Sequence, residues 1–128
     1  MTATHVAWRR SDLGADVPTP AVLDDTVVVC TDGGVIEGLE AATGTTLWKE
    51  QLPKNRHAYS ASPVIAEGRV LATREDGETA IVELPAAGGA AALVGSGMLD
   101  EMTVATPVCV DGRIFLRSRD ALWCIAAE

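Results

Sequence analysis

The sequence predicts an all-β chain made of β-propeller blades, each of four antiparallel strands, with about three blades forming a partial propeller or arc. A Ser/Thr-Pro segment recurs at intervals of 43 or 44 residues, at Pro20, Pro63 and Pro107. Short apolar runs rich in β-branched residues follow each proline and are separated by turn residues. No segment shows the 3.6-residue apolar period of a helix. A repeat of this length with four strands is typical of a propeller blade.

Each repeat begins with a predicted hairpin. A pair of carboxylate or glycine residues stands four and five residues after each proline, which favours a two-residue turn. An apolar run follows each pair, and a second turn then leads into a third strand. The first turns are Asp24-Asp25, Glu67-Gly68 and Asp111-Gly112, and the second turns are Asp32-Gly33, Asp76-Gly77 and Arg119-Asp120.

A fourth strand completes the first two repeats. A small-residue turn, "AATG" or "AAGG", precedes the strands "TTLWKEQL" and "AAALVGSG". The segment "HVAWRRSDLG" near the start parallels the first of these strands, with Trp8 matching Trp48. We therefore treat the whole chain as a single propeller-repeat domain. Its parts are the outer strand of a blade (1–18), a blade (19–60), a second blade (61–105) and an incomplete blade (106–128).

Three blades are too few to close a ring, because propellers typically have about 4–8 blades. One interpretation is that the chain is the C-terminal part of a larger propeller, with Trp8 belonging to an earlier blade. Alternatively, two copies associate and together supply six blades, since a head-to-tail contact that closes is physically allowed. Unpaired edge strands favour association in either case. The expected structural partners are therefore other blades or a second copy.

Residues 38–48, "GLEAATGTTLW", carry a family resemblance. The run resembles the pyrroloquinoline-quinone (PQQ)-type propeller repeat, whose pattern is roughly Ala-Leu-Asp-Ala-x-Thr-Gly-x-x-x-Trp. Gly38 and Glu40 replace the first alanine and the aspartate. The positions that match as they stand are Leu39, Ala41, Thr43, Gly44 and Trp48. The last blades also look like the C-terminal blades of bacterial outer-membrane-assembly-factor-like propellers.

The resemblance implies a role for the tryptophans. In this family the tryptophan packs between neighbouring blades against the small residues of the turn, so Trp48, Gly44 and Trp8 are expected to be docking residues. A tryptophan can bury about 150–250 Å² in such a contact. The second repeat departs from the pattern, with Pro85 in the place of Glu40 and Leu93 in the place of Trp48. Its docking contact is therefore expected to be weaker or absent.

Charge and hydropathy exclude some classes of partner. The net charge of −8 and the pI near 4.6 argue against nucleic acid, which is bound by basic surfaces. No apolar run reaches the ~18 residues of a membrane span. The first residues lack the apolar stretch of a signal peptide. The family resemblance nevertheless implies a periplasmic or cell-envelope location.

The cysteines and carboxylates bear on cofactors. Quinone-dependent dehydrogenases that share this repeat use calcium, an aspartate base and, in many cases, two adjacent cysteines beside the quinone. Cys30, Cys109 and Cys124 are far apart in the sequence, and no DxDxDG calcium loop is present. We therefore expect neither PQQ nor calcium to be bound, and we assign no catalytic or metal-binding residue.

The loops from each fourth strand to the next first strand are the candidate binding elements, because loops on a rigid scaffold often carry function. Arg56, His57 and Tyr59 in the middle loop, with Asp100 and Glu101 in the next, could hold a ligand. Near a carboxylate, His57 could also serve in acid–base chemistry. The alternative is a solvated loop in which Tyr59 packs on the rim.

Three functional hypotheses remain from the sequence. The main one is a non-catalytic PQQ-like propeller module that acts as a scaffold binding a protein or peptide. A second is a fragment of a quinone-dependent dehydrogenase. A third is a purely structural chain whose only partner is the rest of its own propeller.

Overall fold

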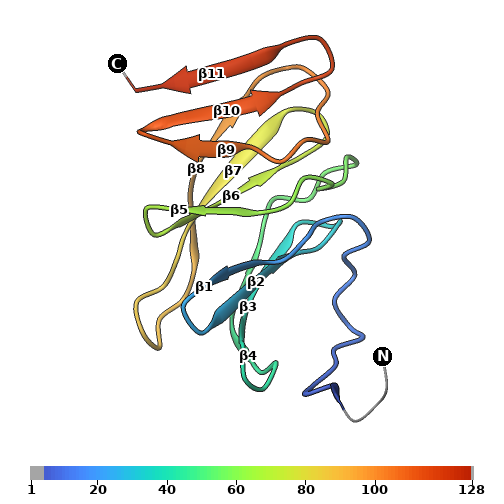
Figure 1. Cartoon of the computed structure of the whole chain (residues 1–128). Helices are drawn as coiled ribbons and strands as arrows, with labels where there is room; N and C mark the ends of the chain where they lie inside the picture. The colour runs from blue at the N-terminus through green and yellow to red at the C-terminus, as the bar shows by residue number, and fades with distance from the viewer. Residues whose placement is uncertain (1–4, 128) are drawn as a thin grey trace.

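The computed structural model of the chain describes residues 5–127 and contains three antiparallel sheets of 4, 4 and 3 strands (Figure 1). The predicted all-β, blade-like fold is therefore confirmed. The first sheet contains β1 (Ala21–Leu23), β2 (Thr26–Cys30), β3 (Val35–Glu40) and β4 (Thr46–Gln51). The second contains β5 (Val64–Ala66), β6 (Arg69–Thr73), β7 (Glu78–Glu83) and β8 (Ala92–Met98), and the third β9 (Val108–Val110), β10 (Arg113–Arg117) and β11 (Leu122–Ala126).

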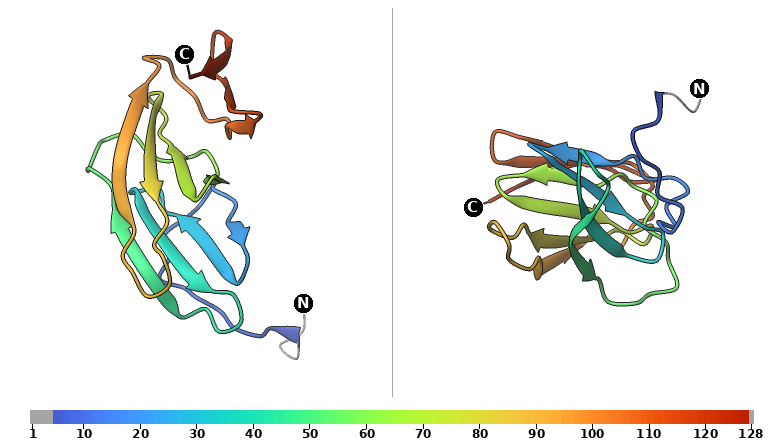
Figure 2. Two further views of the ribbon diagram at one scale, coloured as in Figure 1. Left: turned by 90° about the vertical axis from the view of Figure 1, so that its left-hand side faces the viewer. Right: turned by 90° about the horizontal axis from the view of Figure 1, so that it is seen from below.

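The sheets are stacked as an arc. Within each sheet, strands that follow one another in the chain are neighbours. The first strand of the second sheet, β5, contacts both β1 and β9, so the proline-led segments occupy equivalent innermost positions. The left panel of Figure 2 shows β4 and β8 along the other side of the stack. The first and last described segments of the chain lie toward opposite ends of the arc (Figure 1).

The predicted two-residue turns form the first hairpin of each sheet. Asp24, Glu67 and Asp111 each have a φ of 49°, a left-handed conformation that aspartate tolerates better than most residues. Gly68 and Gly112 follow with positive φ, which glycine adopts without steric cost. Carboxylate and glycine residues therefore recur at these turns because the backbone there has a positive φ.

The main core lies between the first and second sheets. It contains alternate residues of facing strands, as expected for two sheets packed face to face. Burial raises the pKa of the Cys30 thiol to about 12, with a smaller contribution from Asp32, so this cysteine stays protonated and serves as a small apolar residue. The cluster contains Val28, Cys30, Ile36, Trp48, Leu52, Tyr59, Val70, Ala72, Ala80, Val82 and Ala91.

Trp48 packs on a glycine of its own sheet. Gly38 on β3 is the cross-strand partner of Trp48 on β4, and a Cβ on Gly38 would lie 2.1 Å from the indole ring. In the second sheet the equivalent pair is Ile81 and Gly95, so the large and small residues exchange strands. A Cβ on Gly95 would meet nothing within 4 Å, so Ile81 does not cover Gly95 as Trp48 covers Gly38.

This pairing corrects two sequence assignments. Gly95, not Leu93, takes the place of Trp48 in the second sheet, because Trp48 pairs with Gly38 and Gly95 pairs with the equivalent residue, Ile81. Glu83, not Pro85, takes the place of Glu40, since each pairs with the first residue of the preceding strand. The β7–β8 connection is longer than the β3–β4 connection, so the residues of the two turns do not align one to one.

The strand predicted within residues 1–18 does not form in residues 5–18, and residues 1–4 lie outside the described part of the chain. A fourth strand needs a third strand beside it, and no strand of this structure pairs with the segment. Trp8 instead covers the β3–β4 turn. Its indole N–H donates to the Ala41 carbonyl at 2.8 Å, and a Cβ on Gly44 would lie 2.6 Å from its ring.

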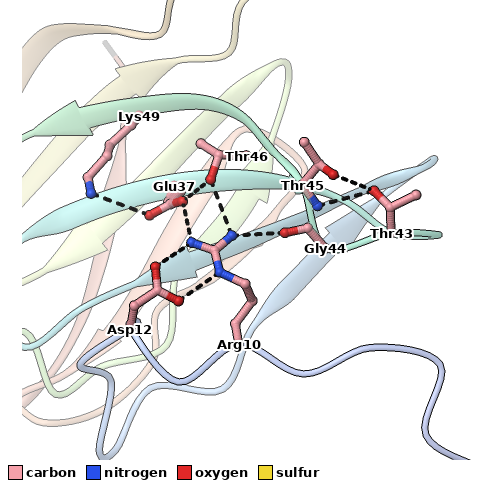
Figure 3. A network of polar contacts seen from close by, with 8 residues as sticks. All are labelled: Arg10, Asp12, Glu37, Thr43, Gly44, Thr45, Thr46 and Lys49. Atoms are coloured by element: carbon pink, nitrogen blue, oxygen red, sulfur yellow. Dashed lines mark hydrogen bonds and ion pairs between the residues drawn. The ribbon is translucent and has the colours of Figure 1, made fainter.

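An arginine fixes the same segment to the first sheet (Figure 3). Arg10 donates to both carboxylate oxygens of Asp12 at 2.7 Å, to the Gly44 carbonyl at 2.8 Å and to Glu37 at 3.2 Å. Arg10 lowers the pKa of Asp12 to about 2. The Glu37 carboxylate is only 3% exposed and also faces Lys49. A buried carboxylate is costly without such partners. The ion pair between Arg10 and Glu37 therefore holds the N-terminal segment on the first sheet.

Candidate protein-binding loops

Two inter-blade loops meet at one turn of the second sheet. Residues 52–63 connect the first sheet to the second, and residues 99–107 connect the second to the third. Glu75, in the β6–β7 turn, donates its N–H to the Ala58 carbonyl and accepts at its own carbonyl from the Thr103 N–H, both at 3.0 Å. One residue therefore bonds to both loops, which fixes them relative to the second sheet.

This contact repeats along the arc. In the first sheet Asp32 occupies the corresponding place, donating to the Gly14 carbonyl and accepting from the Tyr59 N–H at 3.1 Å each. In the third sheet the Arg119 N–H donates to the Met102 carbonyl at 2.8 Å. Each loop thus crosses the second turn of the sheets on either side. The loop face, formed by residues 52–63 and 99–107, is therefore fixed by backbone hydrogen bonds that recur with the repeat.

A buried arginine supports the middle of this face. The Arg74 side chain is 5% exposed, and its guanidinium donates to Asp76 at 2.8 and 2.9 Å and forms an ion pair with Glu78. Its carbon lies 6.0 Å from the centre of the Tyr59 ring, within range of a cation–π contact. The hydrogen bonds from Arg74 hold the pKa of Asp76 below its usual value. Sequence reasoning missed Arg74, although a basic residue followed by acids two and four places later is visible in "REDGE".

Tyr59 is not a surface residue, contrary to its selection as a ligand contact. It is 3% exposed, and its ring lies against Gly34, where a Cβ would be 2.7 Å away. Burial raises the pKa of its hydroxyl. The next residue, Ser60, donates to Glu75 at 2.6 Å. This part of the loop therefore anchors the surface and does not present a binding group.

Arg56 and His57 form the outer part of the same loop. Arg56 is exposed and its Nε donates to His57 Nε2 at 3.2 Å. His57 is half-buried, and its N–H donates to the Asn55 side chain at 3.0 Å. These two residues remain available at the surface, and their binding role stays a prediction.

The two predicted acids of the next loop have different surroundings. Asp100 is exposed and adopts a left-handed φ of 53°. The Glu101 carboxylate accepts from the Ser118 hydroxyl and from the Trp123 indole N–H at 3.3 Å, so it ties the loop to the third sheet. Within residues 5–127, no hydrogen bond or ion pair joins these acids to Arg56 or His57. The predicted residues therefore fall into two separate sets, one on each loop. The β6–β7 turn is hydrogen-bonded to both loops.

Apolar side chains on the second loop were not selected from the sequence. Met102 is 53% exposed and Val104 is 56% exposed, although both are large and apolar. They line a shallow groove of about 320 Å³ together with Arg117 and Arg119 of the third sheet. Exposed apolar residues beside positive charge suit contacts with another protein better than contacts with water.

Possible metal ligands and cysteine thiols do not cluster in the residues that the structure describes. In residues 5–127 no three His, Cys, Asp or Glu side chains lie close enough to hold a metal ion. Cys30 is buried, Cys109 half-buried and Cys124 exposed, and none is in a disulfide. This donor set does not fit a calcium ion or a pair of adjacent cysteines. No helix in the same residues is long and apolar enough to cross a membrane.

Comparison with known proteins places the chain among propeller proteins. A family model described as outer membrane protein assembly factor BamB matches residues 3–92. The crystal structure of BamB from Moraxella catarrhalis is similar over 83% of this chain, with a TM-score of 0.60 and 24% identity. Quinohemoprotein alcohol dehydrogenase ADHIIG from Pseudomonas putida HK5 is similar over 83%, with a TM-score of 0.64 and 20% identity. At these identities the structural likeness shows the fold alone.

A sequence relative is similar over a shorter stretch. The tetrathionate hydrolase of Acidianus ambivalens is 36% identical over 52 residues, which is 41% of this chain and 10% of that protein. The chain spans 32% of the BamB structure and 17% of the dehydrogenase structure. It therefore corresponds to about a third or less of the proteins that it resembles.

Proposed function

Because the chain belongs to the family of the outer membrane protein assembly factor BamB, we propose that it is a non-catalytic set of propeller blades whose inter-blade loops bind another protein. The observation that carries this proposal is the pair of backbone hydrogen bonds by which Glu75 holds both loops. A surface that is fixed before binding loses little conformational freedom when a partner arrives. The partner would meet two loops that already hold one arrangement.

The chemistry of the loops favours a peptide segment with apolar and acidic side chains. Met102 and Val104 supply exposed apolar area. Arg117 and Arg119 supply positive charge in the same groove, and Lys54 and Arg56 supply it on the other loop. The chain as a whole carries a net charge of −8, so local positive charge would favour approach of an acidic partner at this face.

A peptide-display screen on the full chain tests the proposal. We expect enriched peptides to be acidic and apolar, and we expect Arg56→Glu or Met102→Ser to weaken their binding about fivefold to thirtyfold. Arg69→Glu is the matched control, because Arg69 is exposed beside the β5–β6 turn, at the other end of the second sheet. Affinity is measured by fluorescence anisotropy. Failure to enrich any peptide, or equal weakening by the control, would contradict the proposal.

The same family membership supports a cell-envelope location. The matching family model is described as outer membrane protein assembly factor BamB. We infer that this chain serves in that compartment as one part of a scaffold.

An enzyme fragment is the alternative, favoured by the structural likeness to a quinohemoprotein dehydrogenase. If that alternative holds, the full chain mixed with PQQ and calcium should reduce an artificial electron acceptor in the presence of an alcohol. We expect no acceptor reduction above the rate of PQQ and calcium alone, and no thermal shift on their addition. A protein-dependent rate would replace the scaffold proposal with the oxidoreductase one.

A further inference from the structure

We propose that the outer edge of β8 binds an extended segment of another protein, which adds to the second sheet as a fifth strand, antiparallel to β8. The segment is apolar in its centre and carries lysine or arginine at its N-terminal end. The proposal goes beyond the loop-binding function and uses a different surface. In the second sheet β8 is the last strand of the order β5-β6-β7-β8, so no strand of residues 5–127 pairs with its outer side (Figure 2). Unpaired backbone groups on such an edge are a template for a further strand.

The edge is uncovered although the second sheet lies between the other two. Every residue of β8 except Gly95 is exposed, and Gly95 has no side chain to cover. By contrast, β4, the corresponding strand of the first sheet, has Trp48 buried in the main core. Val94 and Met98 on β8 are 50% and 48% exposed. Neither neighbouring sheet therefore covers this strand, and its apolar side chains face solvent.

β8 lacks the charges that usually protect an edge strand. Residues 84–99, which include β8, are the longest run in the sequence without Asp, Glu, Lys or Arg. β4 is also an outer strand, but it contains Lys49 and Glu50, and the Lys49 side chain is 60% exposed. Charged side chains, lysine in particular, hinder the addition of another strand. Of these two outer strands, β8 is therefore the one open to pairing.

The second half of β8 has the regular geometry that a partner strand needs. A bulge leaves Val94 out of the register, but the residues from Gly95 to Met98 pair in regular order with β7. A Cβ added at Gly95 or Gly97 would meet nothing within 4 Å, so the space beside this stretch is open. Apolar side chains of a partner strand could cover Val94 and Met98. We therefore place the added strand along Gly95–Met98.

Charge around β8 favours a different protein over a second copy of this chain. Residues 84–107 contain Asp100 and Glu101 but no lysine or arginine, and the chain carries a net charge of −8. Two copies paired through β8 would therefore offer no opposite charge to each other there. Asp100 is exposed two residues after the end of β8. The N-terminal end of an antiparallel partner would lie beside it, so a basic residue at that end would be attracted.

A synthetic strand tests the proposal on the full chain. The probe is the peptide Lys-Lys-Thr-Val-Thr-Val-Thr-Val, amidated at its C-terminus and labelled with a fluorophore, and its binding is measured by fluorescence anisotropy. Replacing both lysines with glutamate should weaken binding about fivefold or more. Methylating the backbone nitrogens that face β8 should weaken it about tenfold or more, because backbone hydrogen bonds are lost. Amide exchange of Gly95–Met98 should slow when the probe is added.

Gly97→Lys tests the edge from the side of the chain. An added Cβ at this position meets nothing within 4 Å, so the variant should keep its fold, which circular dichroism checks. The new lysine places a charge on the edge and repels the lysines of the probe, so binding should weaken about tenfold or more. Gly33→Lys is the matched control, because Gly33 is exposed in the β2–β3 turn and its added Cβ also meets nothing within 4 Å. It makes the same change of charge and should alter binding less than about twofold.

Several outcomes would overturn the proposal. One is no binding of the probe up to about 1 mM, and another is unchanged binding after either set of alternate nitrogens is methylated. Equal weakening by Gly97→Lys and Gly33→Lys would also contradict it. Self-association of the peptide-free chain that Gly97→Lys abolishes in sedimentation would assign the edge to a second copy instead. Arg56→Glu, which tests the loop proposal, should leave binding of this probe unchanged, so the two proposals can fail independently.

Discussion

Replacing Trp48 with alanine is expected to lower the free energy of unfolding by about 3–5 kcal/mol, the usual range for removing a buried tryptophan. The side chain is 9% exposed and belongs to the cluster shared by the first and second sheets. Gly38 beneath it has no side chain that could fill the space. The loss therefore combines lost apolar burial with a cavity that cannot collapse. Urea denaturation followed by circular dichroism measures the change.

The second sheet suggests how to rescue this loss. Gly38→Ile alone should also destabilise, because its Cβ would lie 2.1–2.5 Å from three atoms of the indole ring. Trp48→Gly alone leaves the space empty. Combined, the two changes place the large residue on the third strand, as in the register pair of Ile81 and Gly95, and remove the ring that the new isoleucine would meet. The double variant should therefore be more stable than the sum of the single effects predicts, with a coupling energy of about 1–3 kcal/mol.

A control separates this coupling from general effects of glycine replacement. Gly97→Ala lies on β8, where an added Cβ meets nothing within 4 Å, and should change stability by less than about 0.5 kcal/mol. If the two changes at positions 38 and 48 are simply additive, then the tryptophan and the glycine do not fill a shared space. The pairing of a large and a small residue would in that case contribute no coupling energy to stability.

The repeat predicts most of the fold because its signals are local. Proline, carboxylate–glycine pairs and β-branched runs determine where hairpins turn, and the three sheets follow from them. The strand expected at Trp8 fails for a non-local reason, since a strand needs a neighbouring edge to pair with. The match of Trp48 to Gly95 also depends on the longer turn between β7 and β8, since both sheets have the same bulge. Neither feature is visible when the repeats are aligned by residue type alone.

The loop site was harder to predict. Arg56 lies at the surface as a polar loop residue should, but Tyr59 and Glu101 are used for internal contacts. Arg74 looks like a solvated charge in the sequence, yet it is buried. Its burial depends on Tyr59, fifteen residues earlier, and on its acidic neighbours. Contacts between loops decide which polar residue remains outside, and such contacts have no local sequence signal.

Arg74→Ala is expected to cost about 2–4 kcal/mol of stability and to loosen the loop face. Removing one partner of a buried ion pair usually costs about 3–5 kcal/mol, but Asp76 and Glu78 keep some contact with water, which reduces the loss. The Tyr59 ring would lose its cation–π contact as well. Hydrogen exchange at Glu75 and Thr103 should become faster, because Arg74 supports the turn that holds both loops.

The same arginine predicts a pH dependence with a definite sign. Arg74 holds the folded-state pKa of Asp76 below its unfolded value, so the contact stabilises the fold above about pH 4, the ordinary pKa of aspartate. The stabilisation is lost as the pH falls through the lowered pKa and Asp76 is protonated. The difference in unfolding free energy between the unaltered chain and Arg74→Ala should therefore shrink as the pH is lowered from about 7 to below 4.

Asp76→Asn distinguishes this charge effect from packing. The substitution keeps the shape of the side chain but removes its charge, so it should reproduce part of the Arg74→Ala loss at neutral pH and little of it at low pH. Arg74→Met, which keeps apolar bulk over Tyr59, should recover packing and not the pH dependence. A constant difference across the pH range would mean that Arg74 stabilises the loops by filling space. The ion pair with Asp76 and Glu78 would then be only a means of burying the guanidinium.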